Sequence, residues 1–318
     1  MKFFNMIFSR RMIMWFFAAS FSIFATSVYA ETTTVTVPKV TDRYAQLSKD
    51  VKLFYHDSGK GPVMVFVPGW TMSSEVFKAQ MAYFNKKYRV ITLDPRSQGR
   101  SSITLENNDY TQHGADLARF FDVLGLKKVV LVAWSWGCND AYAYMRLKGV
   151  DNLRAFVCID APPKPSGGKK EWARNDYPNW GTVIVQPMMY NRDQFTPVWV
   201  QSMVERKLKP QEQAWMVKES LRTPTYAAMQ LALDAIYADY RPEAKLLNSR
   251  GIPTLNFVSQ QSSVNAAKWL KANAPNSQIK IMGKHLMFWE HPEEFNQTLN
   301  TFLEGINSPH SNTKEGSS

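Results

Sequence analysis

Short apolar runs alternate with helical segments along most of this chain, and this alternation limits the fold more than any other feature of the sequence. The runs resemble strands that are buried on both faces of a sheet, and they cover residues 63–67, 88–93, 128–133, 153–159, 253–258 and 278–282. Helical spacing separates them, at residues 73–84, 113–124, 137–148, 264–274 and 292–302. The alternation predicts an α/β fold with a mostly parallel central sheet that is flanked by helices on both faces.

Residues from about 161–247 interrupt this alternation. They have no strong strand pattern and are rich in aromatic residues and Met, including Trp172, Trp180, Trp199 and Trp215. The ordinary explanation is a helical subdomain that buries its own aromatic side chains. Because the segment lies between two predicted strands, it can also cover the carboxyl edge of the sheet. We therefore predict an inserted helical cap that lines an apolar substrate pocket.

The first 30 residues have the pattern of a secretory signal peptide. A basic stretch precedes an apolar run over residues 12–26, and Val28–Ala30 supplies the small residues that signal peptidase accepts. We predict cleavage near Ala30 and export of the mature chain, to a periplasm or out of the cell, with no membrane span left. An uncleaved anchor is the alternative, but the run is short for ~30 Å of hydrocarbon.

The rest of the chain is expected to form one domain over residues 31–306, because no Gly/Ser-rich or Pro-rich linker divides it. The polar tail at residues 307–318 is expected to fray. The net charge is +11, and loss of the three basic residues of the signal leaves +8, with Lys and Arg scattered along the chain. A nucleic-acid-binding protein would have a focused basic face and a reading module. We expect a small-molecule partner instead, and the sequence leaves the oligomeric state open.

Cys138 and Cys158 are the two cysteines of the chain, and both lie in segments that we predict to be buried. An even number of cysteines in an exported protein permits one disulfide. Two free thiols that pack as small apolar side chains are the alternative. The spacing of the pair suits no zinc site, and we find no motif for another metal or an organic cofactor.

The segment Ala133–Gly137 carries the strongest functional signal. It joins a predicted aliphatic strand to a predicted helix, and Ser135 lies at its centre. A serine on such a sharp strand-to-helix turn presents its hydroxyl at the edge of the sheet, and the turn tolerates only small residues two positions away on either side. Ala133 and Gly137 meet this requirement. We predict that Ser135 is a nucleophile; the alternative is a buried structural serine.

Two backbone amides are expected to form an oxyanion hole beside this serine. One belongs to Trp136, at the start of the helix, where the helix dipole favours negative charge. The other belongs to Trp70, which follows Gly69 in the turn after the strand at residues 63–67. A glycine there allows the backbone to approach a substrate closely. An ordinary tight turn is the alternative explanation for Pro68-Gly69.

A serine nucleophile needs a base close in space, and His285 is the best candidate by position. It follows the last predicted strand, so it can reach back to the sheet edge where Ser135 lies. His291 is the competitor, although its neighbours suggest the cap of the closing helix. The remaining histidines of the mature chain are placed less favourably: His56 in an early strand or turn, His113 at the head of a helix, and His310 in the tail.

With these motifs in order, the chain resembles the α/β-hydrolase family over about Val51 to Leu303. The resemblance depends on Pro68–Trp70, Asp94–Ser101, the turn at Ser135, and Gly283–His285 with Glu290–Phe295. It implies a helical lid in the position where we predict the cap. A serine nucleophile argues against the dehalogenase branch of the family, which uses Asp.

The chain departs from the family in the acid that would orient the histidine. Relatives usually carry an Asp a few residues after the strand at residues 253–258, but this sequence reads Ser259-Gln260-Gln261-Ser262 there. Some relatives place the acid after the preceding strand, which corresponds to Asp160 here. We assign the role to Asp160. Glu290, an uncharged helper such as Gln261, and a dyad without an acid remain as alternatives.

The sequence therefore predicts an exported serine hydrolase that cleaves small to medium apolar esters or lactones through an acyl-enzyme. Two other hypotheses remain. The same Ser-His pair supports perhydrolysis, acyl transfer or C–C bond cleavage in relatives of this fold. A non-catalytic binding protein on a hydrolase scaffold is the third hypothesis, prompted by the missing acid after residues 253–258.

Overall fold

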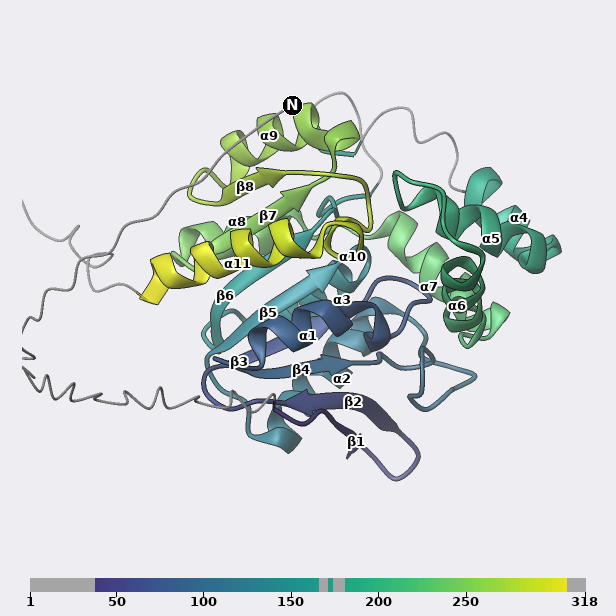
Figure 1. Cartoon of the computed structure of the whole chain (residues 1–318), viewed down its shortest axis with the longest axis horizontal. Coiled ribbons are helices and arrows are strands. Elements are labelled where there is room, and N and C mark those ends of the chain that lie inside the picture. Colours follow the sequence, from purple (N-terminus) through teal and green to yellow (C-terminus); the bar gives the residue numbers. More distant parts are fainter. Residues whose placement is uncertain (1–37, 166–170, 174–180, 308–318) are drawn as a thin grey trace, which may run out of the picture. The chain divides into compact units, whose positions relative to one another are not determined.

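The computed structural model describes residues 38–165, 171–173 and 181–307, shown in Figure 1. The predicted signal peptide and the tail from residue 308 onward lie outside the described residues, as does part of the predicted cap. Within the described ranges, every helix is too short or too polar to cross a bilayer.

The core of the protein is an eight-stranded sheet with the order β1-β2-β4-β3-β5-β6-β7-β8. The strands are β1 (Thr41–Gln46), β2 (Lys52–Ser58), β3 (Val63–Val67), β4 (Arg89–Leu93), β5 (Val129–Trp134), β6 (Leu153–Ile159), β7 (Thr254–Val258) and β8 (Gln278–Ile281). Strand β2 runs antiparallel to both of its neighbours, and β3 to β8 are parallel to one another. The predicted mostly parallel α/β sheet is confirmed.

Helices cover both faces of this sheet. Outside the cap, they are the 3-10 helix η1 (Ser74–Phe77), α1 (Lys78–Phe84), α2 (Tyr110–Leu124), α3 (Gly137–Lys148), α8 (Arg241–Ser249), the 3-10 helix η3 (Gln260–Ser262), α9 (Ser263–Asn273), α10 (Met287–Glu290) and α11 (Pro292–Asn307). Alternate residues of β5 face the helices on opposite sides of the sheet. Leu131 and Ala133 pack on the side of α2, α3, α8 and α9, whereas Val132 and Trp134 pack on the side of α1 and α11. The inner strands are thus buried on both faces of the sheet, which explains their continuous apolar sequences.

Strands β1 and β2 were not predicted as such. Strand β1 lies at the edge of the sheet, and four of its six residues are exposed. An edge strand with polar residues does not produce the apolar run by which the inner strands were identified. His56, expected in an early strand or turn, lies in β2.

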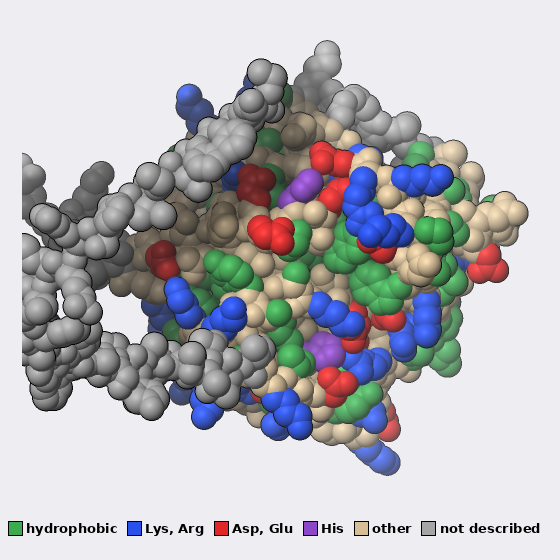
Figure 2. Space-filling view, viewed as in Figure 1, with side chains coloured by type: hydrophobic (Ala, Val, Ile, Leu, Met, Phe, Trp, Pro, Cys, Tyr) green, Lys and Arg blue, Asp and Glu red, His purple; other side chains and the backbone are tan. Residues whose placement is uncertain are grey.

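The segment between β6 and β7 forms a helical insertion, as predicted. Its helices are η2 (Gly181–Val185, a π-helical turn), α4 (Gln186–Tyr190), α5 (Arg192–Ser202), α6 (Pro210–Leu221) and α7 (Thr225–Tyr237). In Figure 1, α4 to α7 lie to one side of the sheet, beyond the carboxyl ends of its parallel strands. Helix α8 then returns to the sheet and packs against α3. On the molecular face shown in Figure 2, Lys and Arg side chains are interspersed with acidic and neutral ones.

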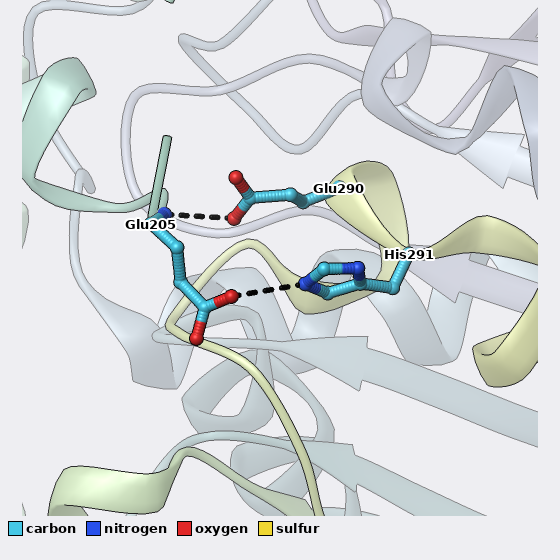
Figure 3. Close-up of side chains that lie close together, drawn as sticks. All are labelled: Glu205, Glu290 and His291. Carbon is cyan, nitrogen blue, oxygen red and sulfur yellow. Dashed lines mark hydrogen bonds and ion pairs between the residues drawn. The ribbon is translucent and has the colours of Figure 1, made fainter. Parts of the chain in front are cut away.

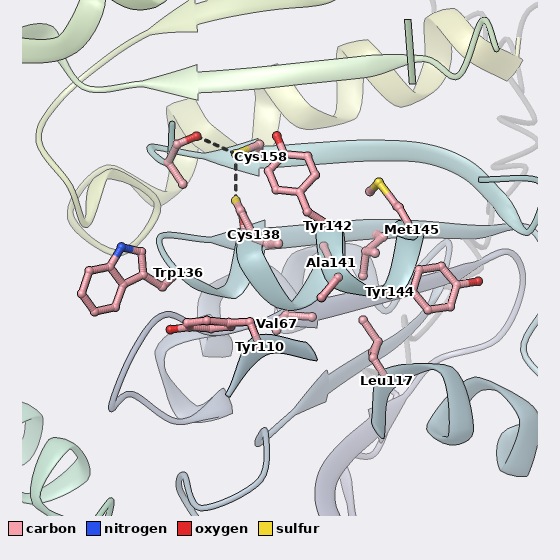
Figure 4. Packing of buried hydrophobic residues seen from close by; sticks show 14 of the residues in the cluster. Val67, Tyr110, Leu117, Trp136, Cys138, Ala141, Tyr142, Tyr144, Met145 and Cys158 are labelled. Atoms are coloured by element: carbon pink, nitrogen blue, oxygen red, sulfur yellow. Dashed lines mark hydrogen bonds between the residues drawn. The ribbon is translucent and has the colours of Figure 1, made fainter. Parts of the chain in front are cut away.

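Cys138 and Cys158 lie in the core between α3 and β6 (Figure 4). Both are fully buried free thiols, and their Sγ atoms are 2.7 Å apart. Burial raises the pKa of the Cys138 thiol well above its usual value. Of the two alternatives, the structure has the free thiols. They pack the start of α3 against β6.

The loop after β4 is fixed by buried charges. The guanidinium of Arg96 donates two hydrogen bonds of 2.7 Å to the carboxylate of Asp116 in α2, and both side chains are only 8% exposed. In the same loop, the Asp94 carboxylate accepts the backbone N–H groups of Ser74 and Arg100, at 2.6 and 2.7 Å. The Asp94–Ser101 motif is therefore a structural element, because these bonds hold the loop that joins β4 to α2.

Replacing Arg96 by Met is expected to lower the free energy of unfolding by about 3–5 kcal/mol, because the Asp116 carboxylate would stay buried without its partner. Urea denaturation followed by circular dichroism measures this loss. Lys87→Met is the matched control, because the Lys87–Glu304 pair is more than half exposed and its loss should cost less than about 1 kcal/mol. Equal effects of the two substitutions would contradict a structural role for the buried pair.

Candidate active site

Ser135 lies in the turn between β5 and α3, with a φ of 55°. This left-handed backbone is strained for a residue other than glycine, and such strain is concentrated at functional sites. The turn also explains why residue 137 must be small. A Cβ atom on Gly137 would lie 2.4 Å from the carbonyl oxygen of Pro68, so no side chain fits there without moving the backbone.

His285 lies beside Ser135, in the loop between β8 and α10. Its Nε2 is 2.8 Å from the Ser135 Oγ, and its Nδ1 is 2.7 Å from the Asp160 Oδ2. With the imidazole proton on Nδ1, the ring donates to Asp160 and accepts from the serine hydroxyl. His291 is elsewhere: its Nε2 contacts Glu205 at 3.1 Å, and its side chain is 40% exposed.

Asp160 directly follows β6 and has a φ of 51°. Its side chain is 7% exposed, and its Oδ1 accepts the backbone N–H of Ser259 at 2.9 Å. Burial by itself would raise the pKa of Asp160, but the hydrogen bond and charge of His285, with the Ser259 amide, outweigh it and hold the pKa below its usual value. The carboxylate is therefore ionised at neutral pH.

Ser259 directly follows β7, where the chain has no acid, and it contributes to the site through its backbone. In this stretch the resemblance to the family led us to expect an Asp. Its contribution is a backbone amide that binds the Asp160 carboxylate from the neighbouring strand. The pattern of side chains in the sequence could not reveal this role, because the donor is a main-chain group.

Trp134 is a second contributor that sequence analysis missed. Its indole N–H donates to the backbone carbonyl of His285 at 2.8 Å, and the two rings are 5.4 Å apart. The side chain is fully buried and also contacts Phe288 edge-on. Because Trp134 immediately precedes Ser135, one residue links the nucleophile turn to the loop that holds His285. The sequence places it after the strand predicted to end at residue 133, in the turn that carries Ser135, and gives no sign of its contact with His285.

The turn at residues 68–70 passes directly against the nucleophile. A Cβ atom on Gly69 would lie 2.8 Å from the Ser135 Cβ, so only glycine allows this approach. The rings of Trp70 and Trp136 are 5.1 Å apart, and the Trp70 indole N–H donates to the carbonyl of Ala228 in α7 at 2.9 Å. The residues predicted to form an oxyanion hole are thus next to Ser135, and Trp70 also anchors the cap.

A cavity of about 370 Å³ opens onto Ser135 and His285. Five tryptophans from the sheet edge and the insertion line it: Trp70, Trp134, Trp136, Trp172 and Trp199. Val183, Ile184 and Met203 of the insertion add aliphatic and thioether surface. The cap therefore provides one wall of an apolar pocket, as the sequence indicated.

His56, His113 and Glu290 have other partners, and His310 lies outside the described residues. His56 bonds Asp42, and His113 bonds Asp140. Glu205, Glu290 and His291 form a group whose ligand-type atoms lie within 4.8 Å of one another (Figure 3). The Glu290 carboxylate already accepts the backbone N–H groups of Glu205 and Arg206, at 2.8 and 3.0 Å. We interpret this group as an anchor between the cap and the His285 loop, and assign it no metal.

Comparison with known proteins agrees with this geometry. Residues 62–292 match the family model described as alpha/beta hydrolase fold. The chain belongs to the α/β-hydrolase family. It is 25% identical over 274 residues to a putative non-heme chloroperoxidase of Synechocystis, which covers 81% of this chain and 96% of the relative.

Two further relatives of this α/β-hydrolase are esterases by name. A bifunctional esterase/perhydrolase of Acinetobacter calcoaceticus is 32% identical over 123 residues, or 38% of this chain and 45% of the relative. The solved structure of an esterase from Exiguobacterium antarcticum superimposes with a TM-score of 0.74 and 21% identity, over 84% of this chain and 100% of the other. At this identity the structural likeness establishes the fold alone.

Asp160→Asn is expected to slow the reaction of Ser135 with a fluorophosphonate on the order of 10⁴-fold. The amide would donate to Nδ1 of His285, so the ring could no longer accept the serine proton. Glu290→Gln is the control, since its partners are backbone amides of the cap, and labelling should stay within a few-fold of wild type. Circular dichroism confirms that both variants are folded. Slow labelling of Glu290→Gln together with fast labelling of Asp160→Asn would instead identify Glu290 as the acid that orients His285.

Proposed function

We propose that this protein is a serine hydrolase that cleaves small to medium apolar carboxylic esters or lactones. The observation that carries the proposal is the chain of hydrogen bonds from Asp160 through His285 to Ser135, at 2.7 and 2.8 Å, at the base of an aromatic cavity. Nucleophile, base and orienting carboxylate in this arrangement are sufficient for acyl transfer. The esterases among its relatives support the choice of substrate class.

In the proposed reaction, His285 takes the proton of the Ser135 hydroxyl as Oγ bonds to the carbonyl carbon. Backbone amides of Trp70 and Trp136 donate hydrogen bonds to the resulting oxyanion, which stabilises the transition state. The tetrahedral intermediate collapses, and His285 returns the proton to the departing alkoxide oxygen. Water, deprotonated by His285, then attacks the acyl-enzyme, and His285 returns the proton to the Ser135 Oγ as the carboxylic acid leaves. Asp160 stays ionised and stabilises the imidazolium in both steps. These steps need no metal or organic cofactor.

Perhydrolysis is the second candidate, because a relative carries both activities in its name. Hydrogen peroxide would replace water as the acceptor and give a peroxy acid from the same acyl-enzyme. Acyl transfer to an alcohol would likewise differ from hydrolysis only in the acceptor that attacks the acyl-enzyme. The ratio of products formed from one ester in water, peroxide and alcohol separates these outcomes.

The case for a non-catalytic binding protein depended on the missing acid after residues 253–258. Asp160 supports the catalytic proposal against it, because its carboxylate contacts the Nδ1 of His285 from the neighbouring strand. Export stays a proposal that is supported by the signal-like pattern of residues 1–30. A mature N-terminus at residue 31 would agree with it, and an intact one would oppose it.

Ser135→Ala is expected to reduce kcat on short-chain para-nitrophenyl esters by about 10⁶-fold, the order seen when a nucleophilic serine is removed from such a site. Steady-state kinetics over several chain lengths measures the effect. The matched control is Ser263→Ala, which removes a half-buried serine in α9 that does not line the cavity. Turnover that survives in Ser135→Ala on every ester would overturn the proposal.

A further inference from the structure

Lys284 is the one Lys or Arg side chain among the described residues that line the cavity. It directly precedes His285 and is half-buried. To the described residues, its ammonium donates one hydrogen bond, which goes to the backbone carbonyl of Val204 at 3.1 Å. An ammonium has three N–H donors, so this bond leaves two of them for another partner.

No carboxylate of the described residues forms an ion pair with Lys284. Asp160 is the single Asp or Glu among the described residues that line the cavity, and its two oxygens are taken by His285 and by the amide of Ser259. Among the residues that the structure describes, none neutralises the positive charge of Lys284. A charge at an apolar wall interacts more strongly with a bound counter-ion than a charge in water does.

Two further polar side chains of the cavity come from a loop that is bonded to the Lys284 loop. Gln261 and Ser262 line the same cavity, and their loop is joined to the Lys284 loop where the Gln260 N–H donates to the Gly283 carbonyl at 3.2 Å. Within the described ranges, neither of these side chains has a hydrogen-bond partner. An ammonium, a hydroxyl and a carboxamide all donate hydrogen bonds to anionic oxygens. Elsewhere the lining is largely aromatic and aliphatic.

A tether between the His285 loop and the cap is the simpler explanation of Lys284. The tether accounts for the bond to Val204. However, the same two segments are already joined by the Leu286 N–H, which donates to the Met203 carbonyl at 2.9 Å, and by Glu290. A charged side chain in the lining is not required for that purpose.

We propose that the substrate is an ester or lactone that also carries a carboxylate, and that Lys284 binds this carboxylate with help from Gln261 and Ser262. The apolar part of the substrate then contacts the tryptophans, and its scissile carbonyl faces Ser135. This inference rests on the proposed hydrolase function and narrows its substrate class. Lys284 acts as a specificity residue, because it binds substrate without taking part in bond cleavage.

The test is the ratio of two kcat/KM values, for para-nitrophenyl hydrogen glutarate and for its neutral methyl ester. The two esters differ in one negative charge and have the same acyl chain. Wild type is expected to prefer the charged ester at least about tenfold, and this preference should weaken at high salt because exposed charges are screened. In Lys284→Met this ratio of kcat/KM values should fall at least about tenfold, chiefly through a higher KM for the charged ester. Lys284→Arg should keep most of the wild-type preference, because the positive charge stays.

Lys280→Met is the matched control for the loss of one lysine. Lys280 lies in β8, pairs with Glu294 at 2.7 Å, and does not line the cavity, so its loss should leave the ratio unchanged. A ratio near one in wild type, or an equal loss on both esters in Lys284→Met, would overturn the inference and leave the hydrolase proposal intact. If wild type cleaves neither these esters nor any other and Ser135 stays unlabelled, the hydrolase proposal itself fails.

Discussion

The hydrogen bond between Asp160 and His285 is the contact on which the arrangement of the site depends. It joins the end of β6 to a loop that begins 122 residues later in the chain, after β8 ends at Ile281. The two segments meet because parallel strands bring their carboxyl ends to one edge of the sheet. With Nδ1 held by the carboxylate, Nε2 is fixed toward Ser135. The bond therefore sets both the orientation of the ring and the atom that carries its proton.

Main-chain constraints hold the two ends of this bond in place. Ser135 and Asp160 both have left-handed backbones, at the ends of adjacent strands. The Ser259 amide fixes the carboxylate, and the Trp134 indole fixes the carbonyl of His285. Each contact comes from a different strand end, so the site requires the whole edge of the sheet to be formed.

Several hydrogen bonds join the cap to this edge, and two side chains, Trp70 and Glu290, are prominent among the donors and acceptors. Trp70 reaches from the turn beside Ser135 to the carbonyl of Ala228 in α7, and Glu290 binds the backbone of Glu205 and Arg206 beyond the His285 loop. Trp70 lies close to Ser135 in space, and Glu290 follows His285 closely in the sequence. Any movement of the cap would therefore act on the turn at residues 68–70 and on the His285 loop together.

The sequence was most informative where a residue is buried on both sides. Strands β3 and β6 have the predicted bounds because double burial leaves a continuous apolar run, whereas β1 at the exposed edge leaves none. Ser135, His285 and Asp160 could be proposed because the order of motifs assigns each to a strand end. The contributions of Trp134 and Ser259 could not, because an indole bound to a carbonyl and a backbone amide have no recognisable pattern in a sequence. The choice between Asp160 and Glu290 also needed three-dimensional geometry, since both follow an apolar segment.

Trapping an acyl-enzyme would show whether Ser135 is the nucleophile. Wild-type protein would be mixed with a slowly deacylating para-nitrophenyl ester, quenched with acid in the first turnover, and mapped by peptide mass spectrometry. We expect the acyl mass on the peptide that contains Ser135, at close to one group per molecule. An acyl group on any other residue, or hydrolysis that proceeds with no acylated peptide in the first turnover, would contradict this expectation.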